Sequence, residues 1–179
     1  MLAVFVLESL LAGGCVIERD HASRTTVSPI FDARPYEKIA IVVMDQDGRV
    51  QQNGEMRQIE GIFLKELLGK GYAVAARSDM DSVLSEIALQ MAMITEYDAM
   101  HIGQMIRARG ILLISIGHAL NTFSITARLL DTSQAQIMWV SSYTGSYWTY
   151  PVNASAMSSE LMTVAKVIAK DFPSSAPKP

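Results

Sequence analysis

The sequence predicts a single α/β domain built on a mixed β-sheet. Two observations support this: a continuous apolar run over 39–44, and a strict alternation of apolar and polar residues over 122–130. The first pattern is typical of a strand buried on both faces, and the second of a half-buried antiparallel strand. Between them, apolar residues recur at helical spacing. The chain has 179 residues, of which 50% are hydrophobic and 18% charged, a balance typical of one globular domain.

The expected order of elements is β-α-β-α-α-β-β-β-α. Strands are expected at 39–44, 72–76, 111–117, 122–130 and 136–145. Helices are expected at 55–68, from 78 onward, at 96–109 and at 153–171. Two early strands joined through a helix favour a parallel start, whereas three consecutive closing strands favour an antiparallel C-terminal meander. The helices are expected to pack on this sheet, and the domain to span 36–172.

The N-terminal segment 1–14 resembles a bacterial lipoprotein signal. Its apolar stretch ends in Ala-Gly-Gly, directly before Cys15, which is the single cysteine of the chain. Small residues before a cysteine suit a signal peptidase, so Cys15 is expected to be lipidated as the first residue of the mature protein. The alternative is a buried N-terminal element with Cys15 as an ordinary buried thiol. A basic region normally precedes such a stretch, and we expect the true start to lie upstream of Met1.

Residues 15–35 are predicted to form a flexible tether behind the lipidated cysteine, because they are polar and contain two prolines. Val16 follows the cysteine, where the inner-membrane retention signal has aspartate, and this favours the outer membrane. No apolar stretch reaches the roughly 18–20 residues of a membrane span. The tail 173–179 is predicted to be disordered from its composition. The expected location is therefore the periplasm, with a palmitate-type lipid anchor in the outer membrane.

Composition argues against several function classes. The net charge is −3 and the basic residues form no run, so nucleic acid is not an expected partner. One cysteine permits neither an internal disulfide nor a cysteine-based zinc cluster. The histidines at 21, 101 and 118 lack the i, i+4 spacing of metal ligands. We therefore expect no metal and no cofactor.

Two groups of residues are candidates for a protein-contact surface. The first is aromatic and follows the last predicted strand: Tyr143, Tyr147, Trp148 and Tyr150. Aromatic side chains at this density are typical of interfaces, and a cap packed over the sheet is the alternative. The second group contains the closely spaced methionines at 91, 93, 100 and 105. Flexible thioethers can line a binding groove, but ordinary core filling is the favoured interpretation.

An enzymatic alternative comes from the acids after the first predicted strand. Asp45-x-Asp47-Gly48 resembles the opening motif of haloacid-dehalogenase phosphatases, in which the first aspartate is the nucleophile. Ser115 would serve as the serine or threonine that follows a second strand in those enzymes. Such an enzyme also needs a lysine at the phosphate and an acid pair for magnesium, and no lysine occurs between 72 and 165. A Mg-dependent phosphohydrolase using Asp45 and Asp47 is therefore only the alternative, and no catalytic residue is expected.

Four segments follow one another in a recognisable order: YEKIAIVV, GYAVAARSDMDSVLSE, IGQMIRARGILLISIG and ITARLLDTSQAQIMW. The positions that carry the pattern are Arg77, Leu84, Glu86, Ile102-Gly103, Arg128-Leu129-Leu130-Asp131 and Trp139. Together they resemble the bacterial envelope lipoproteins of the curli-secretion-component superfamily. That group includes activators of penicillin-binding proteins and is related to the N-terminal domain of the Tol-Pal propeller protein. The Thr-Gly usual before the last strand is replaced here by Gln134-Ala135.

The resemblance implies a non-catalytic, lipid-anchored periplasmic module. Its implied partners are other envelope proteins, with a homo-oligomer as a further option. Its implied role is that of an adaptor that assembles or regulates a secretion, flagellar or peptidoglycan-synthesis complex. The chain between Gly110 and Gly145 has room only for plain hairpins, so no pore-forming barrel is expected.

Overall fold

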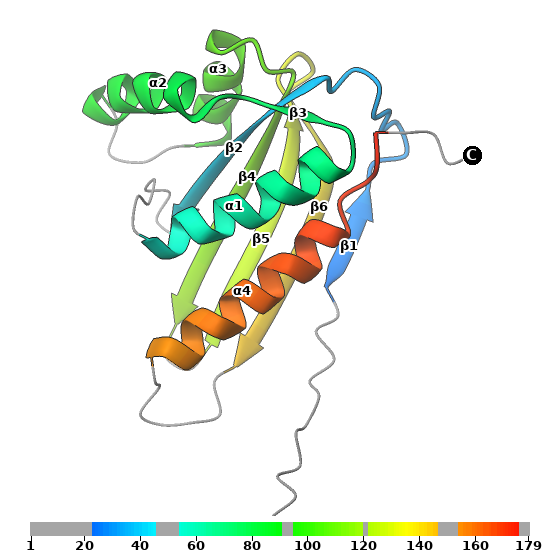
Figure 1. Ribbon diagram of the computed structural model, residues 1–179. Coiled ribbons are helices and arrows are strands. Elements are labelled where there is room, and N and C mark those ends of the chain that lie inside the picture. Colours follow the sequence, from blue (N-terminus) through cyan, green and yellow to red (C-terminus); the bar gives the residue numbers. More distant parts are fainter. Residues whose placement is uncertain (1–22, 46–53, 91–94, 120–121, 147–153, 176–179) are drawn as a thin grey trace, which may run out of the picture.

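The computed structural model describes residues 23–45, 54–90, 95–119, 122–146 and 154–175. It confirms the predicted single α/β domain with a mixed sheet (Figure 1). The strands are β1 (Arg24–Val27), β2 (Lys38–Asp45), β3 (Ala73–Val74), β4 (Gly110–Ala119), β5 (Thr122–Asp131) and β6 (Gln136–Ser146). The helices are α1 (Gly54–Gly69), α2 (Arg77–Gln90), α3 (Glu96–Met105) and α4 (Ala154–Lys170). Within this described part of the chain, no helix is long and apolar enough to cross a membrane.

The strands form one sheet in the order β1-β6-β5-β4-β2-β3. Strand β2 pairs in parallel with β3 and β4, and β4, β5, β6 and β1 pair antiparallel in succession. The parallel start and the antiparallel meander are therefore both confirmed. Helix α1 connects two neighbouring parallel strands, as a crossover connection requires.

Strand β1 lies inside the segment 15–35 that the sequence predicts to be a flexible tether. It pairs with β6, with Arg24 opposite Ser142 and Val27 opposite Trp139. Its residues Arg-Thr-Thr-Val are mostly β-branched and favour an extended backbone. The ordered domain therefore begins before residue 36 and has one more strand than expected. Cys15 and the predicted signal segment lie outside the described residues.

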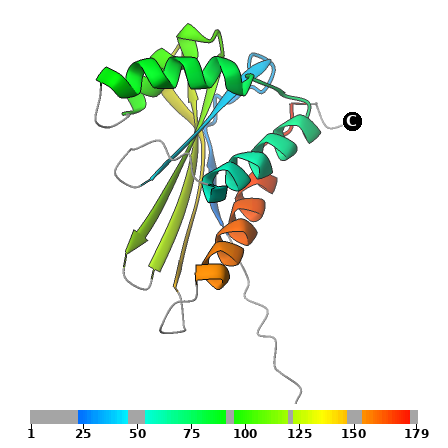
Figure 2. The ribbon, with the colours of Figure 1, turned by 60° about the vertical axis from the view of Figure 1, so that its left-hand side comes forward.

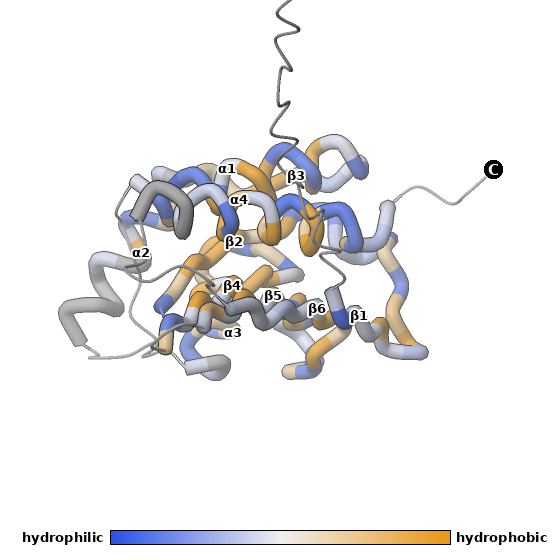
Figure 3. Tube along the Cα trace, turned by 90° about the horizontal axis from the view of Figure 1, so that it is seen from below, coloured by the Kyte–Doolittle hydropathy of each residue, from blue (hydrophilic) through white to orange (hydrophobic). Residues whose placement is uncertain are grey.

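Helices α1 and α4 cover one face of the sheet (Figures 1 and 3). Alternation along the strands sends one set of side chains into this larger core, including Ile39 and Ile41 of β2 and Ile125 of β5. Trp139 lies at its centre with no exposed surface, and its ring meets that of Phe172 edge-on at 4.8 Å. Each fully buried side chain of this size contributes about 1.5–3 kcal/mol of burial free energy.

Helices α2 and α3 cover the opposite face, but over one half only (Figure 2). The smaller core there contains the other set of side chains, such as Ala40 and Val42 of β2 and Leu113 of β4, packed against Ile102 of α3. No described helix covers the rest of this face, along β5, β6 and β1 (Figure 2). The sheet therefore has a fully covered face and a half-open face.

Candidate functional site

Asp131 fixes the turn between β5 and β6. Its Oδ1 accepts hydrogen bonds from the amides of Ser133 and Gln134, at 2.8 and 3.0 Å, and from the hydroxyl of Ser133 at 2.6 Å. Its Oδ2 accepts from the Tyr36 hydroxyl at 2.9 Å and lies 3.4 Å from Nε of Arg109. The residue is only 1% exposed. Because both oxygens are fully used, this acid acts structurally, as an anchor of the turn.

Burial alone would raise the pKa of the Asp131 carboxyl. The hydrogen bonds from Ser133, Tyr36 and the turn amides outweigh that effect and leave the pKa below its ordinary value. Burial raises the pKa of Tyr36, and the neighbouring carboxylate raises it further. The aspartate therefore stays ionised and the tyrosine protonated at neutral pH, which is the pairing that their hydrogen bond requires.

Thr132 connects this turn to α3. Its hydroxyl donates to the carbonyl oxygens of Ala108 and Arg109 at 3.0 and 3.1 Å, and its own carbonyl accepts from the Gln104 side chain at 3.0 Å. At the other end of α3, Thr95 and Asp98 form a capping box that satisfies the first free amides of the helix. The first turn of α3 is therefore ordered by its own cap, and its last turn is bonded to the β5–β6 turn, so the space between helix and turn has defined walls.

That space is a hollow of about 220 Å³, here called the α3 hollow. It is lined by Tyr97, Met100, His101, Gln104, Thr132, Ser133 and Ala135. Tyr97 is 75% exposed at its rim, and Met105 on the same helix is 45% exposed. Core filling, the favoured interpretation of the clustered methionines, is confirmed for Met100, which packs against the smaller core, and is wrong for Met105, while 91 and 93 lie outside the described residues. An aromatic ring and a thioether beside polar groups suit contact with a protein side chain.

The half-open face of the sheet carries a second group of polar side chains. Strand register places eight hydroxyl residues on it: Thr26, Ser115, Thr122, Ser124, Thr126, Ser142, Thr144 and Ser146. Two arginines share this surface, Arg24 on β1 and Arg128 on β5. We call this surface the open hydroxyl face. Among the described residues, the register places no aspartate or glutamate on it.

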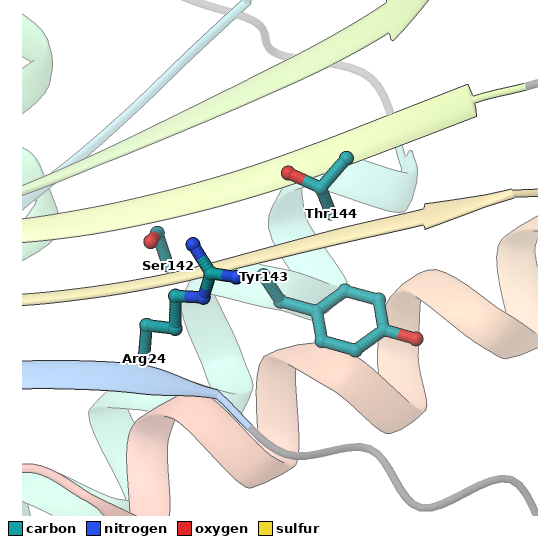
Figure 4. Close-up of a pocket in the computed structure, with 4 residues that line it drawn as sticks. All are labelled: Arg24, Ser142, Tyr143 and Thr144. Atoms are coloured by element: carbon teal, nitrogen blue, oxygen red, sulfur yellow. The ribbon is translucent and has the colours of Figure 1, made fainter.

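A hollow of about 300 Å³ adjoins the edge of this face, lined by Arg24, Ser142, Tyr143 and Thr144. Figure 4 shows the guanidinium of Arg24 extending over β6 towards Ser142 and Tyr143. Tyr143 lies on the covered side of the sheet, where its ring packs 5.7 Å from that of Phe123. Of the four predicted contact aromatics, Tyr143 thus lines a hollow, while Tyr147, Trp148 and Tyr150 lie outside the described residues.

Asp45, the first acid of the phosphatase alternative, does not meet Ser115. Met44 pairs with Ser115 and Asp45 with Ile116, whose side chain lies in the larger core. Alternation therefore sends Asp45 towards the covered face and Ser115 towards the half-open face. Asp47 lies outside the described residues. In the described part of the chain, no three His, Cys, Asp or Glu side chains are grouped to hold a metal ion.

Comparison with known proteins gives likenesses in fold alone. No family model matches the sequence. No curated protein matches it either. The PelC dodecamer from Paraburkholderia phytofirmans has 13% identity and a TM-score of 0.49, covering 83% of this chain and 94% of that one. Lipoprotein GNA1162 from Neisseria meningitidis has 18% identity and a TM-score of 0.45, covering 76% and 99%.

The C-terminal domain of LpoB from Salmonella enterica has 11% identity and a TM-score of 0.46, covering 62% of this chain and 83% of that one. At these identities and TM-scores, the three likenesses transfer no activity, partner or residue role to this chain.

Proposed function

We propose that this chain is a lipid-anchored periplasmic module that binds other envelope proteins without catalysis. On this proposal Cys15 carries the lipid, the outer membrane holds the anchor, and the domain helps to assemble or regulate an envelope machine. A secretion, flagellar or peptidoglycan-synthesis complex is the class of machine that we propose. The observation that carries the protein-binding role is the α3 hollow, with Tyr97 largely exposed at its rim.

A large exposed tyrosine on a well-ordered helix supports this role. The capping box orders the first turn of α3, and burial of Ile102 with the Gln104–Thr132 hydrogen bond holds the helix on the sheet, so little ordering is needed when a partner contacts Tyr97. Aromatic residues in such positions supply much of the binding free energy of protein interfaces. The Asp131 cluster supports the same conclusion because it provides the wall of the hollow rather than a reactive group.

The binding role is tested by crosslinking in intact cells. A photo-reactive amino acid is placed at Tyr97, in the α3 hollow, and as a control at Lys65, an exposed position on α1. We expect discrete protein adducts from position 97 and none of the same mass from position 65. Identical adduct patterns from both positions would count against a specific site. Loss of the adduct in Tyr97→Ala, measured with the photo-reactive group moved to Gln104, would identify the ring as a contact.

The anchor is tested by metabolic labelling with a fatty acid. We expect label in the unaltered protein and none in Cys15→Ser, with the envelope fraction of the protein falling in parallel. Equal labelling of the two would contradict lipidation at Cys15. The catalytic alternative is tested by turnover of a generic phosphate ester with magnesium: hydrolysis that Asp45→Asn abolishes would replace the adaptor role with an enzymatic one.

A further inference from the structure

Strand β1 forms one outer edge of the sheet. Among the described strands it pairs with β6 alone, and all four of its residues are exposed. The amide of Ser28, directly after β1, donates to the carbonyl of Met138 on β6 at 2.9 Å. Because backbone groups along a strand point alternately to its two sides, Thr26 faces β6 in the same way, whereas Thr25 and Val27 direct their N–H and C=O groups outwards. The edge therefore presents two donors and two acceptors.

These outward groups are complementary to an extended polypeptide backbone. Within the described part of the chain, no hydrogen bond uses the outward backbone groups of Thr25 or Val27. An unpaired strand edge of this kind is a template for pairing with another strand. Pro29 limits the edge, because it would be the next outward residue and has no N–H to donate. The available ladder is therefore short, with two outward residues on either side of Thr26.

A second copy of β1 fits this edge in an antiparallel register that uses all of its outward groups. Thr25 then lies opposite Val27 of the other copy, and Val27 opposite the other Thr25, which gives two hydrogen-bonded pairs with two bonds each. The two-fold axis passes beside Thr26, whose two copies face each other as a non-hydrogen-bonded pair. Arg24 lies opposite Ser28 of the other copy. The two arginines are then about 14 Å apart, so like charges do not meet.

The side chains of β1 suit the same pairing. Three of the four are β-branched, a type that packs well in cross-strand pairs. Val27 is 46% exposed and would be partly covered by the other copy's Thr25. The hydroxyl of Thr25 lies 2.9 Å from Oγ of Ser141 and 3.1 Å from Oδ2 of Asp171. These contacts hold the edge in place before a second copy arrives, so little ordering is needed on pairing.

Four backbone hydrogen bonds make a weak contact in solution. A stable interface between folded domains buries about 800 Å² on each partner, more than a four-residue edge offers. The chain from Cys15 to Arg24 spans at most about 30 Å, so a lipid at Cys15 would keep every β1 close to one membrane. Confinement to a shared surface raises the effective concentration of one edge near another. The anchor therefore favours a second copy as the occupant.

We propose that β1 is a homodimerisation edge, at which two copies anchored in one membrane pair antiparallel about a two-fold axis at Thr26 and join their sheets into one. The proposal goes beyond the protein-binding role of the α3 hollow and rests on the proposed function only for the anchor at Cys15. None of the residues that line the α3 hollow belongs to β1, so the dimer presents two such hollows.

Disulfide formation tests the two-fold axis directly. In a non-hydrogen-bonded pair the Cα atoms are about 4.5 Å apart, a separation that a disulfide spans. The full chain is purified with Cys15→Ser, which removes its natural thiol, and is oxidised at ~1 mM. We expect Thr26→Cys to form a covalent dimer, and Thr144→Cys, at an exposed site of β6, to form at least tenfold less. No dimer from Thr26→Cys, or equal dimer from both variants, would overturn the proposal.

Proline at position 27 separates edge pairing from folding. Val27→Pro removes an outward N–H and no bond to β6, so the melting temperature should change little while the Thr26→Cys dimer falls at least tenfold. Val27→Ala keeps the N–H and should retain most of the dimer. Dimer formation that Val27→Pro leaves unchanged would show that another surface brings the two thiols together and would overturn the assignment to β1.

The cellular experiment tests the anchor and the choice of occupant. With Cys15 intact, Thr26→Cys should give at least tenfold more dimer than with Cys15→Ser at equal expression, and the unaltered chain gives the background from Cys15 itself. Equal yields would refute pairing through the anchor. A disulfide adduct with another protein in place of the dimer would assign the edge to that protein and overturn the proposal.

The proposed function and the dimer fail separately. Adducts from a photo-reactive group at Tyr97, without a Thr26→Cys dimer, would leave the protein-binding role intact and refute the dimer alone. A Thr26→Cys dimer without adducts at Tyr97 would support the edge and refute the α3 hollow as a binding site. If fatty-acid label is absent from Cys15, the anchor fails, and the purified chain still decides whether the edges pair.

Discussion

The hydroxyl of Tyr36 donates a 2.9 Å hydrogen bond to Oδ2 of Asp131, across 95 residues of sequence and inside the protein. This bond joins the segment before β2 to the turn after β5. Tyr72 is as deeply buried, but its hydroxyl has no hydrogen-bond partner among the described residues, and burial raises its pKa to about 12. The two tyrosines thus form a matched pair in which only one hydroxyl contributes a bond.

Tyr36→Phe should therefore lower the free energy of unfolding by about 1.5–3 kcal/mol, because a hydrogen bond to a buried carboxylate is lost. Tyr72→Phe should change it by less than about 0.5 kcal/mol or raise it, because a buried hydroxyl without a partner is removed. Urea unfolding of both variants measures the difference. Equal destabilisation would show that the Tyr36–Asp131 bond contributes nothing beyond ring packing.

Acidification should lower the free energy of unfolding, because it protonates Asp131. Its pKa is lowered in the folded state, so it contributes stability that is present above the unfolded value, near 3.8, and is lost as pH falls through the folded value. Asp131→Asn should cost about 2–4 kcal/mol at neutral pH, and the difference from the unaltered protein should shrink below about pH 4. The exposed pair of Asp32 and Arg34 supplies the control, since Asp32→Asn should give a smaller, salt-sensitive effect. A pH-independent difference for Asp131→Asn would contradict this linkage.

Gly103 should not tolerate a side chain. A Cβ there would overlap the methyl group of Thr132 and would lie 2.9 Å from two carbons of Ile111. Gly103→Ala should therefore destabilise by about 1–3 kcal/mol, since α3 would be pushed off the sheet. Gly61→Ala on α1 is the matched control, because its Cβ would meet nothing within 4 Å and helix propensity favours alanine by about 1 kcal/mol. Opposite signs of the two changes in thermal unfolding are expected, and equal signs would refute the close packing of α3.

Arg107 and Ala135 occupy backbone positions that favour glycine. Their φ angles are 54° and 55°, in the left-handed region. Arg107 ends α3 in a Schellman motif, in which the amide of Ala108 bonds to the Gly103 carbonyl at 2.8 Å. Ala135 occupies the position of the glycine in the Thr-Gly of the lipoproteins that the sequence resembles. Its positive φ explains why glycine is usual at that position.

Arg107→Gly and Ala135→Gly should each raise the free energy of unfolding by about 0.5–1 kcal/mol. Ala119→Gly, at an exposed strand position without positive φ, should lower it by a similar amount. Melting temperatures of the three variants provide the check. If all three glycines destabilise, the left-handed strain at the first two positions is negligible.

Periodicity was sufficient to predict most of the sheet. The alternation in β5 and the apolar run in β2 have the expected burial patterns, because both are set by local sequence and by the strand repeat of two. Strand β1 was not predictable in the same way. It has four residues and is followed closely by Pro29, and it is stabilised by pairing with β6 and by the 2.9 Å bond from Thr25 to Ser141. Such contacts 116 residues apart leave no local pattern.

The end of α3 and the candidate surfaces also depended on features that local sequence patterns predict poorly. The helix was expected to reach residue 109, but it ends at Met105 because Arg107 turns the backbone where no glycine signals a stop. The sequence Thr-Glu-Tyr-Asp at 95–98 was a detectable capping box that would have placed Tyr97 in the first turn. The open hydroxyl face could be predicted only in part: the alternation in β5 shows which of its residues lie on the polar side of the strand. Its partners on β6 and β1 depend on strand register, which only the folded sheet reveals.

The pairing of β1 with β6 also determines how the domain would respond to mechanical force. Any tension applied through the residues before Ser23 reaches the folded body first at Arg24 and is directed along β1, so its ladder to β6 is loaded in shear rather than unzipped bond by bond. Shear distributes the load over all four residue pairs at once. If a lipid at Cys15 is pulled by relative motion of the membrane and a bound partner, the β1–β6 ladder is the first part of the fold to bear the load, and detachment of β1 would expose the edge of β6.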